Sequence, residues 1–258
     1  MAWLWRALIL LSLACATPVA MAEVPNIAAA ANIKFAMAQL VNNYQQQSGN
    51  QLRVSYGSSG NFVAQIKHGA PFQLFLSADE KYVEALASAG LTADHGVVYA
   101  YGRLALVAPN NSPLTLDTDL DGLSKLLQSG QLQRFAIANP EHAPYGERAR
   151  QLLQQKGLWQ ALQPSIVYGE NVSQAAQFAL SGSTQGGIVA LSLAMAPQFR
   201  ERGRFVALPT ELHNPLTQRM VLLKGAGDVA NDFYRYLQSE PARAVFRAYG
   251  FALPEEGH

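Results

Sequence analysis

The chain contains the stretch Val54-Ser55-Tyr56-Gly57-Ser58-Ser59-Gly60-Asn61, in which a β-type run ends at small and hydroxyl-bearing residues. A helical pattern follows at once, over residues 62–66. The same change occurs at Asn32, where the apolar run that begins at Ile27 meets a helix-like segment over residues 33–41. A helix N-terminus has unpaired N–H donors and the positive end of the helix dipole, so it holds anions without a cationic side chain. Two such junctions predict the capture of a small oxyanion.

Apolar β-type runs alternate with helical patterns along most of the chain. The predicted strands cover residues 26–30, 51–56, 74–77, 97–107, 134–138, 165–168, 187–191, 204–208 and 218–223. The predicted helices cover residues 32–47, 60–68, 80–89, 120–127, 146–155, 172–180, 193–200, 228–237 and 241–249. This alternation is typical of an α/β fold with largely parallel sheets and helices on both faces.

Two breaks suggest that the chain forms two lobes. The predicted strand 97–107 is longer than a usual strand, and the turn-rich segment 109–113 follows it. A second, proline-bearing break covers residues 208–215. If the chain crosses between lobes at both places, lobe I consists of residues 23–101 and 209–258, and lobe II consists of residues 102–208.

Two further strand-to-helix turns fall in the predicted lobe II. Tyr145 stands at the turn after the strand 134–138, where its hydroxyl could point into a cleft. Asn171 is a natural N-cap for the next helix and would leave the N–H of Val172 among the unpaired donors. Ligands of open α/β sheets bind beyond the carboxyl ends of the strands. We therefore expect four turns, at Asn32, Ser59, Tyr145 and Val172, to surround one point in a cleft between the lobes.

The N-terminus has the pattern of a secretory signal peptide. Arg6 gives a positive start, residues 7–16 form a short apolar core, and Ala20-Met21-Ala22 offers a cleavage site. The apolar run is too short for a permanent membrane helix, which is the rival interpretation. We expect residues 1–22 to be a signal peptide cleaved after Ala22. Lipidation at Cys15 is an alternative, because Leu13-Ala14-Cys15 weakly resembles a lipoprotein cleavage site.

Composition excludes several classes of function for the mature chain. Cys15 is the only cysteine, so its removal excludes disulfides, thiolate metal sites and cysteine nucleophiles. The 19 basic residues include Arg6, so cleavage leaves 18 basic against 18 acidic residues. Only 14% of residues are charged and no basic cluster occurs, which argues against nucleic-acid binding. A hydrophobic content of 49% is ample for a globular core.

The pair Ser58-Ser59 leaves room for a serine hydrolase. A hydrolase elbow requires G-x-S-x-G, and residues 57–61 lack the final glycine. Helix capping and anion contact are the other interpretations of this pair. Glu141 and His142 are adjacent metal-ligand types without a third at a suitable spacing, so a solvated loop is the simpler interpretation. Residues 225–230 match a loose dinucleotide fingerprint, but no complete βαβ unit follows them.

Several segments carry a resemblance to a known family. They are Ala28-Ala29-Ala30-Ala31-Asn32, Ser55-Tyr56-Gly57-Ser58-Ser59-Gly60, the stretch 65–79, Asn139-Pro140, Pro144-Tyr145-Gly146 and Gly187-Ile188-Val189. In these segments the chain resembles the periplasmic molybdate-binding proteins of ABC-type uptake systems. The resemblance extends over essentially the whole mature chain.

The resemblance implies a type II periplasmic binding protein fold with two lobes and two crossing segments. It further implies a monomeric periplasmic receptor, not an enzyme, that closes on molybdate and delivers it to a membrane permease. No cofactor is implied, because molybdenum is held as the oxyanion and not through direct metal ligands. Tungstate is nearly the same size, so little discrimination between the two anions is expected.

The resemblance also implies the ligand set. Carried across by motif, the ligands of lobe I fall on Asn32 and Ser59, and those of lobe II fall on Tyr145 and the Val172 N–H. Many family members have serine at the Asn32 position, and several have tyrosine after Gly-Ile-Val, where this chain has Ala190. Here the phenol is expected from Tyr145 instead. A receptor for sulfate or another tetrahedral oxyanion, and a structural or adhesive domain, are the remaining alternatives.

Overall fold

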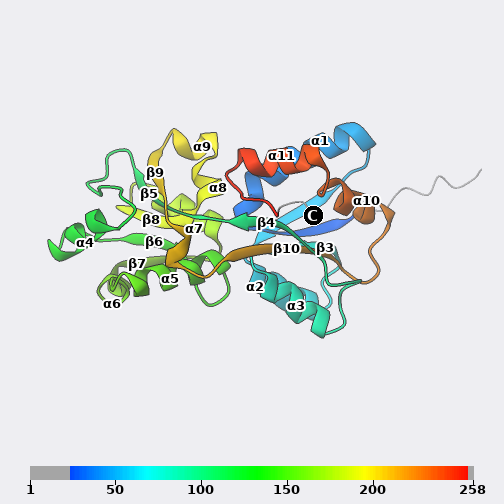
Figure 1. Cartoon of the computed structure of the whole chain (residues 1–258), viewed down its shortest axis with the longest axis horizontal. Helices are drawn as coiled ribbons and strands as arrows, with labels where there is room; N and C mark the ends of the chain where they lie inside the picture. The colour runs from blue at the N-terminus through cyan, green and yellow to red at the C-terminus, as the bar shows by residue number, and fades with distance from the viewer. Residues whose placement is uncertain (1–23, 255–258) are drawn as a thin grey trace, which may run out of the picture.

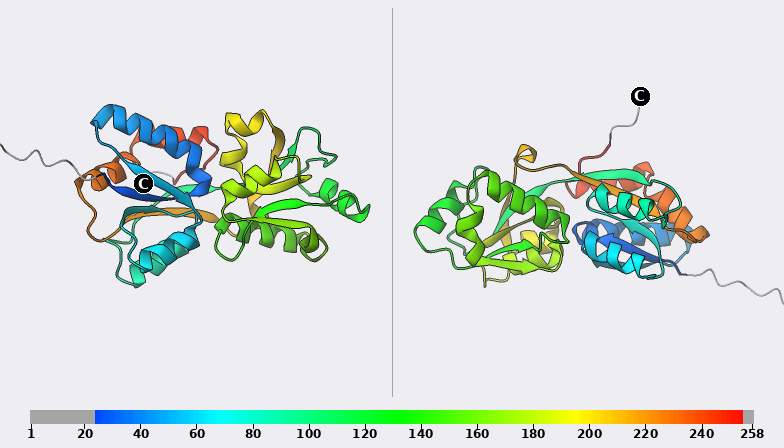
Figure 2. Two further views of the ribbon diagram at one scale, coloured as in Figure 1. Left: turned by 180° about the vertical axis from the view of Figure 1, so that it is seen from behind. Right: turned by 90° about the horizontal axis from the view of Figure 1, so that it is seen from below.

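The computed structural model describes residues 24–254, and its strands belong to two sheets. The strands of the first sheet are β1 Asn26–Ala30, β2 Arg53–Gly57, β3 Phe72–Leu76, β4 Val97–Gly102 and β10 Leu216–Leu222. The strands of the second sheet are β5 Leu104–Pro109, β6 Phe135–Ala138, β7 Ile166–Gly169, β8 Gly186–Ala190 and β9 Gly203–Ala207. Figures 1 and 2 show the two sheets as the centres of two lobes that lie side by side.

Both sheets are mixed but mainly parallel. The strand orders are β2-β1-β3-β10-β4 and β7-β6-β8-β5-β9. In the first sheet β1 pairs in parallel with β2 and β3, while β10 is antiparallel to β3 and β4. In the second sheet β6 pairs in parallel with β7 and β8, while β5 is antiparallel to β8 and β9. One strand of each sheet therefore runs against the other four, and the predicted α/β class with mainly parallel sheets is confirmed.

Helices cover both faces of each sheet. Those packed on the first sheet are η1 Ala31–Ile33, α1 Lys34–Ser48, α2 Ser59–Lys67, α3 Glu80–Ser88, α10 Asp228–Tyr236 and α11 Glu240–Ala248. The remaining helices are α4 Asp121–Gln128, α5 Pro144–Gln155, α6 Trp159–Leu162, η2 Gln163–Ser165, α7 Val172–Ala179, α8 Leu191–Ala194, α9 Pro197–Arg200 and η3 Thr210–Leu212. In Figure 1, α1, α10 and α11 lie on one side of the first sheet, and α2 and α3 lie on the other. Within residues 24–254, no helix combines the length and apolar character needed to cross a membrane.

The core of the first lobe follows the two-residue period of its strands. Leu74 and Leu76 pack with α1, α10 and α11, whereas Phe75 between them packs with α2 and α3. The same alternation occurs in β10, where Met220 and Leu222 face one way and Val221 faces the other. Successive side chains of a strand point to opposite faces, so apolar residues at consecutive positions are required where both faces are covered. This is why the strands appear in the sequence as continuous apolar runs.

The chain crosses twice between the sheets. The apolar run predicted as one strand over residues 97–107 is in fact two strands, because β4 ends at Gly102 and β5 begins at Leu104 in the other sheet. Leu216 at the start of β10 pairs with Gly102, so the return crossing from β9 reaches the first sheet beside the outgoing one. The predicted signal peptide, residues 1–22 with Cys15, lies outside the described residues.

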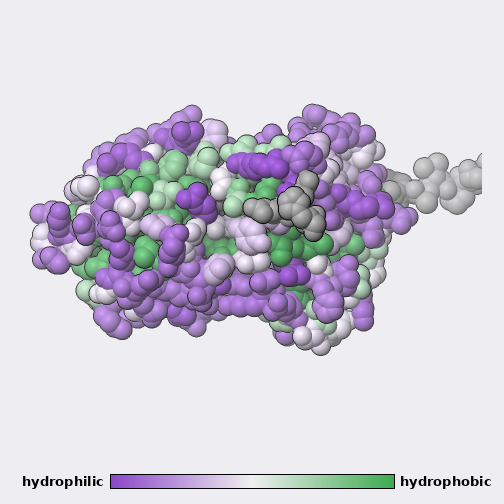
Figure 3. All heavy atoms as spheres, viewed as in Figure 1, coloured by the Kyte–Doolittle hydropathy of each residue, from purple (hydrophilic) through white to green (hydrophobic). Residues whose placement is uncertain are grey.

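The surface is largely polar. Figure 3 shows hydrophilic residues around most of the outline of one face, with hydrophobic residues in patches between them. Among the described residues, the large hydrophobic side chains that are exposed are Tyr101 and Tyr168. Most of the large apolar side chains of the described residues are therefore buried in the two lobes.

Candidate functional site

A small cavity of about 10 Å³ lies where the two lobes meet, and all four predicted site residues line it. Asn32 and Ser59 come from the first lobe, and Tyr145 and Val172 come from the second. The other lining residues are small or apolar apart from Ser58; they are Ala30, Ala31, Gly57, Ser58, Ala78, Ala143 and Pro144. The structure therefore brings together the four turns that the sequence places up to 140 residues apart.

Ser59 is held with its hydroxyl at the first turn of α2. Ser58 is the N-cap of this helix, and its Oγ accepts from the Asn61 N–H at 3.4 Å. Ser59 Oγ instead accepts from the Ala78 N–H at 3.0 Å, and the side chain is fully buried. Because that bond uses the oxygen as an acceptor, the hydroxyl hydrogen of Ser59 remains available to donate.

Val172 contributes its backbone rather than its side chain. It is the first residue of α7, and the N-cap Asn171 accepts from the next two N–H groups, those of Ser173 and Gln174, at 3.0 and 3.1 Å. The helix itself offers no acceptor to the N–H of its first residue. The donor at Val172 is therefore left at the cavity wall, next to the positive end of the helix dipole.

A buried hydrogen-bond network joins Asn32 to Tyr145. Asn32 Nδ2 donates to Tyr145 Oη at 3.3 Å and to Gln218 Oε1 at 3.0 Å. Gln218 Nε2 donates to Tyr145 Oη at 3.0 Å, and Tyr99 Oη donates to Gln218 Oε1 at 2.8 Å. Burial raises the pKa of Tyr145 well above its ordinary value, and the two N–H donors offset this only in part, so the phenol keeps its proton.

One polar atom of this network is left without a hydrogen bond. Asn32 Oδ1 is buried and has no hydrogen-bond partner among the described residues. A buried acceptor without a donor costs about 1–3 kcal/mol. A bound water or a protonated ligand oxygen would remove that cost.

Gly102 leaves the space that this network occupies. A Cβ built at Gly102 would overlap the hydroxyl of Tyr145 and lie 2.5 Å from Gln218 Nε2. We expect Gly102→Ala to displace both side chains and to weaken ligand binding by about tenfold or more, as expected for a lost hydrogen bond to a charged group. Isothermal titration calorimetry on the folded variant measures the loss. Unchanged affinity would show that the position of the Tyr145 hydroxyl is unimportant for binding.

The two lobes contact each other around the cavity. The Gly60 N–H of α2 donates to the His142 carbonyl of the second lobe at 3.0 Å, and Ser192 Oγ of α8 donates to the Asn32 carbonyl at 2.8 Å. Arg148 in α5 forms a buried ion pair with Asp79 in the first lobe, with an N–O distance of 2.6 Å. These contacts hold the cavity closed between the lobes.

The predicted loop at Glu141 and His142 is only partly solvated. Glu141 is exposed and pairs with Arg150. His142 instead lies against the first lobe, with Nδ1 3.0 Å from Ser58 Oγ and Nε2 3.6 Å from Glu170 Oε2. This contact could not be predicted from the sequence, because Ser58 and His142 are 84 residues apart.

The cavity wall carries no charged side chain among the described residues. The nearby guanidinium of Arg148 is committed to Asp79, and it also donates to the Pro215 carbonyl at 3.3 Å. Charge complementarity to an anion therefore comes from N–H and O–H dipoles at helix N-termini. Such a wall suits a small guest that accepts hydrogen bonds on every side.

The family model described as bacterial extracellular solute-binding protein matches residues 25–252. The chain belongs to this family. Two relatives of this solute-binding protein, both called molybdate-binding protein ModA, are 33% identical to it. That of Azotobacter vinelandii matches over 244 residues, 93% of each chain, and that of Rhodobacter capsulatus over 239 residues, 92% of this chain and 90% of the relative.

A solved structure agrees with these relatives. The Azotobacter vinelandii periplasmic molybdate-binding protein has a TM-score of 0.81 and 31% sequence identity to this solute-binding protein, covering 90% of this chain and 100% of that one. The expected two-lobed binding-protein fold is confirmed.

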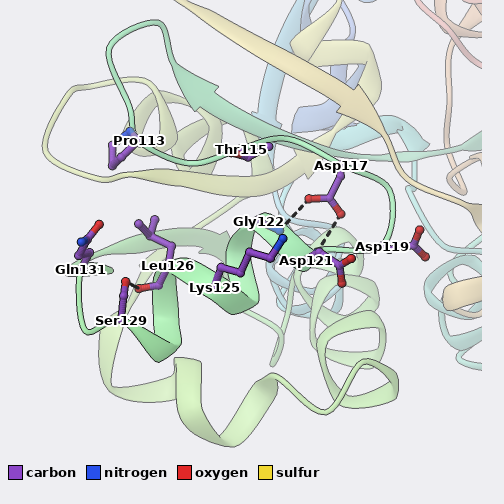
Figure 4. Close-up of a pocket in the computed structure, with 10 residues that line it drawn as sticks. All are labelled: Pro113, Thr115, Asp117, Asp119, Asp121, Gly122, Lys125, Leu126, Ser129 and Gln131. Carbon is purple, nitrogen blue, oxygen red and sulfur yellow. Dashed lines mark hydrogen bonds between the residues drawn. The ribbon is translucent and has the colours of Figure 1, made fainter.

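The solute-binding protein has a larger hollow elsewhere, beside α4. It is lined by Asp117, Asp121, Lys125 and neighbouring residues of that loop and helix. Figure 4 shows both carboxylate oxygens of Asp117 bound to backbone N–H groups, and these are the N–H groups of Asp121 and Gly122, each at 2.8 Å. Burial opposes ionisation of Asp117, but these N–H donors prevail and lower its pKa. The carboxylate thus serves to start α4, and we do not regard this hollow as the ligand site.

Gln218, Tyr99 and Gly102 are the residues of the site that sequence reasoning missed. Gln218 is fully buried between Leu216 and Met220, at a position of β10 whose alternation calls for an apolar side chain. A polar residue at a core position of a strand is the available signal, because it must find buried partners. The partners themselves come from other elements and could not be named from the sequence.

Proposed function

We propose that this protein is a periplasmic receptor that binds molybdate, and also tungstate, in the cavity between its lobes and delivers the anion to an ABC transporter permease. The observation that supports this most is the meeting of uncharged donors from both lobes at one small cavity. The relatives at 33% identity are named for molybdate, which supports the choice of anion. The secretion signal over residues 1–22, cleavage after Ala22 and the monomeric state belong to the same proposal.

The proposed mechanism is closure of two lobes on the ligand. Lobe I would consist of residues 23–101 and 209–258, and lobe II of residues 102–208. A ligand shifts a conformational equilibrium only through its differential affinity for the two states. Ser59 on one lobe and the Val172 N–H on the other can donate to the same anion only when the lobes are together, so binding favours the closed form.

Calorimetry with four anions tests the assignment. We expect molybdate and tungstate to bind, and phosphate to bind at least about tenfold more weakly, because a protonated oxygen that faces an N–H or O–H donor leaves a polar group unpaired. Sulfate has the same charge and the same need for donors, so it must be rejected by its smaller size. Tighter binding of sulfate or phosphate than of molybdate would contradict the proposed ligand, and no binding of any of the four would contradict the whole proposal.

A receptor for a protonated tetrahedral oxyanion is the second candidate. One observation favours it, namely the unpartnered acceptor Asn32 Oδ1. The O–H of a hydrogen phosphate could donate to that oxygen, whereas molybdate has no hydrogen to offer. The same titrations decide, because this candidate requires phosphate to bind more tightly than molybdate.

A histidine lies beside Ser58, as a serine hydrolase would require, but other requirements of a hydrolase are not met. His142 Nδ1 lies 3.0 Å from Ser58 Oγ, and Glu170 lies on the far side of the ring. Ser58, however, is engaged as the N-cap of α2, and the cavity beside it is small, about 10 Å³. We propose that this contact helps to join the lobes and that the protein is not an enzyme. Hydrolysis of a nitrophenyl ester that is lost on Ser58→Ala would contradict this.

Ser59→Ala is expected to weaken molybdate binding by about ten- to a hundredfold, the value of one hydrogen bond to a charged group. The neighbouring Ser58→Ala is the matched control. It removes a helix cap, so we expect the free energy of unfolding to fall by about 0.5–2 kcal/mol with a smaller loss of affinity. Calorimetry and urea unfolding of both variants separate the two effects. Equal losses of affinity would remove the special role assigned to Ser59.

A further inference from the structure

Gln218 lies behind the cavity and does not line it. Its side chain is fully buried in the first lobe. Gln218 is the third residue of β10, the strand that follows the return crossing between the lobes. Its side-chain hydrogen bonds go to the network: Oε1 accepts from Tyr99 and Asn32, and Nε2 donates to Tyr145. Any effect of Gln218 on a ligand must therefore pass through Asn32 or Tyr145.

The bonds to Tyr145 determine where its hydrogen can point. The phenolic oxygen accepts two N–H bonds, from Gln218 Nε2 at 3.0 Å and from Asn32 Nδ2 at 3.3 Å. A hydroxyl has two acceptor lone pairs and one hydrogen, so both acceptor positions are used. Within residues 24–254, no protein acceptor takes the hydroxyl hydrogen, and Tyr145 is itself part of the cavity wall.

Gln218 also orients the amide of Asn32. Gln218 Oε1 is an acceptor, so it attracts the NH₂ group of Asn32 and would repel its oxygen. Both hydrogens of that NH₂ group are then used, one on Gln218 and one on Tyr145. The amide hydrogens of Asn32 therefore stay inside the network, and this amide acts on a ligand through Tyr145.

We propose that Gln218 is a positioning residue that presents the Tyr145 hydroxyl as a donor to the cavity, and that it thereby favours oxyanions whose facing oxygen carries no hydrogen. This deepens the proposed function and rests on it. With Gln218 in place, Tyr145 donates to the guest. Without the Nε2 donor, the phenolic oxygen loses one of the two hydrogen bonds that orient it, so the direction of the hydroxyl hydrogen is no longer fixed and its contact to the anion is lost.

A double-mutant cycle with Tyr145→Phe tests this, with molybdate titrated calorimetrically into all four proteins. Gln218→Met is neutral and similar in length. We expect it to weaken binding by about ten- to a hundredfold in the wild-type background and by less than about threefold in the Tyr145→Phe background. A purely structural role would cost the same factor in both backgrounds, and that result would overturn the proposal.

Gln218→Glu provides a second route if Gln218→Met fails to fold. It keeps the shape but presents an acceptor where Nε2 donates, so the Tyr145 hydroxyl would donate to the carboxylate. Its charge repels the anion in both the wild-type and the Tyr145→Phe backgrounds. The test is therefore how much more affinity is lost in the wild-type background, which retains the hydroxyl. We expect an excess of about tenfold, and no excess would overturn the proposal.

The wild-type titrations keep this proposal separate from the proposed function. If the wild type prefers another of the four anions to molybdate, the molybdate assignment fails, and the cycle run with that anion still decides the role of Gln218. If molybdate binds and the two losses are equal, the positioning role fails while the receptor function stands. If none of the four anions binds, both are overturned.

Discussion

Val172→Pro is expected to weaken molybdate binding by at least about a hundredfold while leaving the fold intact. The substitution removes the backbone N–H, worth about 1.5–3 kcal/mol toward a charged acceptor, and puts a ring carbon in its place. Proline is well tolerated at the first residue of a helix, where Val172 stands. Asn171 already has the extended conformation, φ −148° and ψ 171°, that a residue before proline adopts.

Val172→Ala is the matched control, because it keeps the N–H and shortens only the side chain. We expect its affinity to stay within about threefold of the wild type, since the ligand contact assigned here is the backbone donor. Calorimetry and thermal melting of both variants give the comparison. A folded Val172→Pro protein with wild-type affinity would show that this N–H does not contact the anion.

Arg148→Met is expected to weaken molybdate binding by at least about a hundredfold, because it destabilises the closed form of the protein. It leaves Asp79, 5% exposed, as a buried carboxylate without its main partner, a loss typically of about 3–5 kcal/mol. Separation of the lobes would return Asp79 to water, so the cost falls on closure and hence on affinity. Lys81, 4.0 Å from Asp79, is half exposed and compensates little.

Two controls make this prediction specific. Lys81→Met removes a neighbouring ion pair between the lobes, that of Lys81 with Glu147. The Lys81 side chain is 46% exposed, so we expect the affinity for molybdate to fall by less than about fivefold. The double variant Asp79→Asn with Arg148→Met removes both buried charges but keeps an oxygen to accept from the Lys81 N–H and cap α3. It should recover most of the lost affinity. Wild-type affinity in Arg148→Met alone would mean that the pair plays no part in closure.

The fold class followed from the sequence because its strands and helices have regular patterns. β1 was predicted with the bounds that the structure shows, and most other elements lie within two residues of their predicted bounds. The prediction of a single strand over residues 97–107 was wrong. β5 is buried throughout and β4 is largely apolar, so their apolar patterns join without a gap, and Gly102-Arg103 gave too little sign that the chain changes sheets.

The residues that line the cavity were more predictable than those that support them. Ser59 and Val172 stand at strand-to-helix turns, and such turns can be seen in a sequence. Gln218 and Tyr99 act through contacts among β10, β4, η1 and α5, which depend on the three-dimensional arrangement of the lobes. Their positions in the strands gave no indication of which partners they would meet.

A crystal structure of the wild-type protein with molybdate, with the metal located by anomalous scattering, tests the central claim most directly. We predict one molybdenum atom in the cavity between the lobes, with its oxygens about 2.7–3.2 Å from Ser59 Oγ, Tyr145 Oη and the Val172 nitrogen. No lysine or arginine should contact it. Molybdenum bound elsewhere, or held by a cationic side chain, would contradict the account.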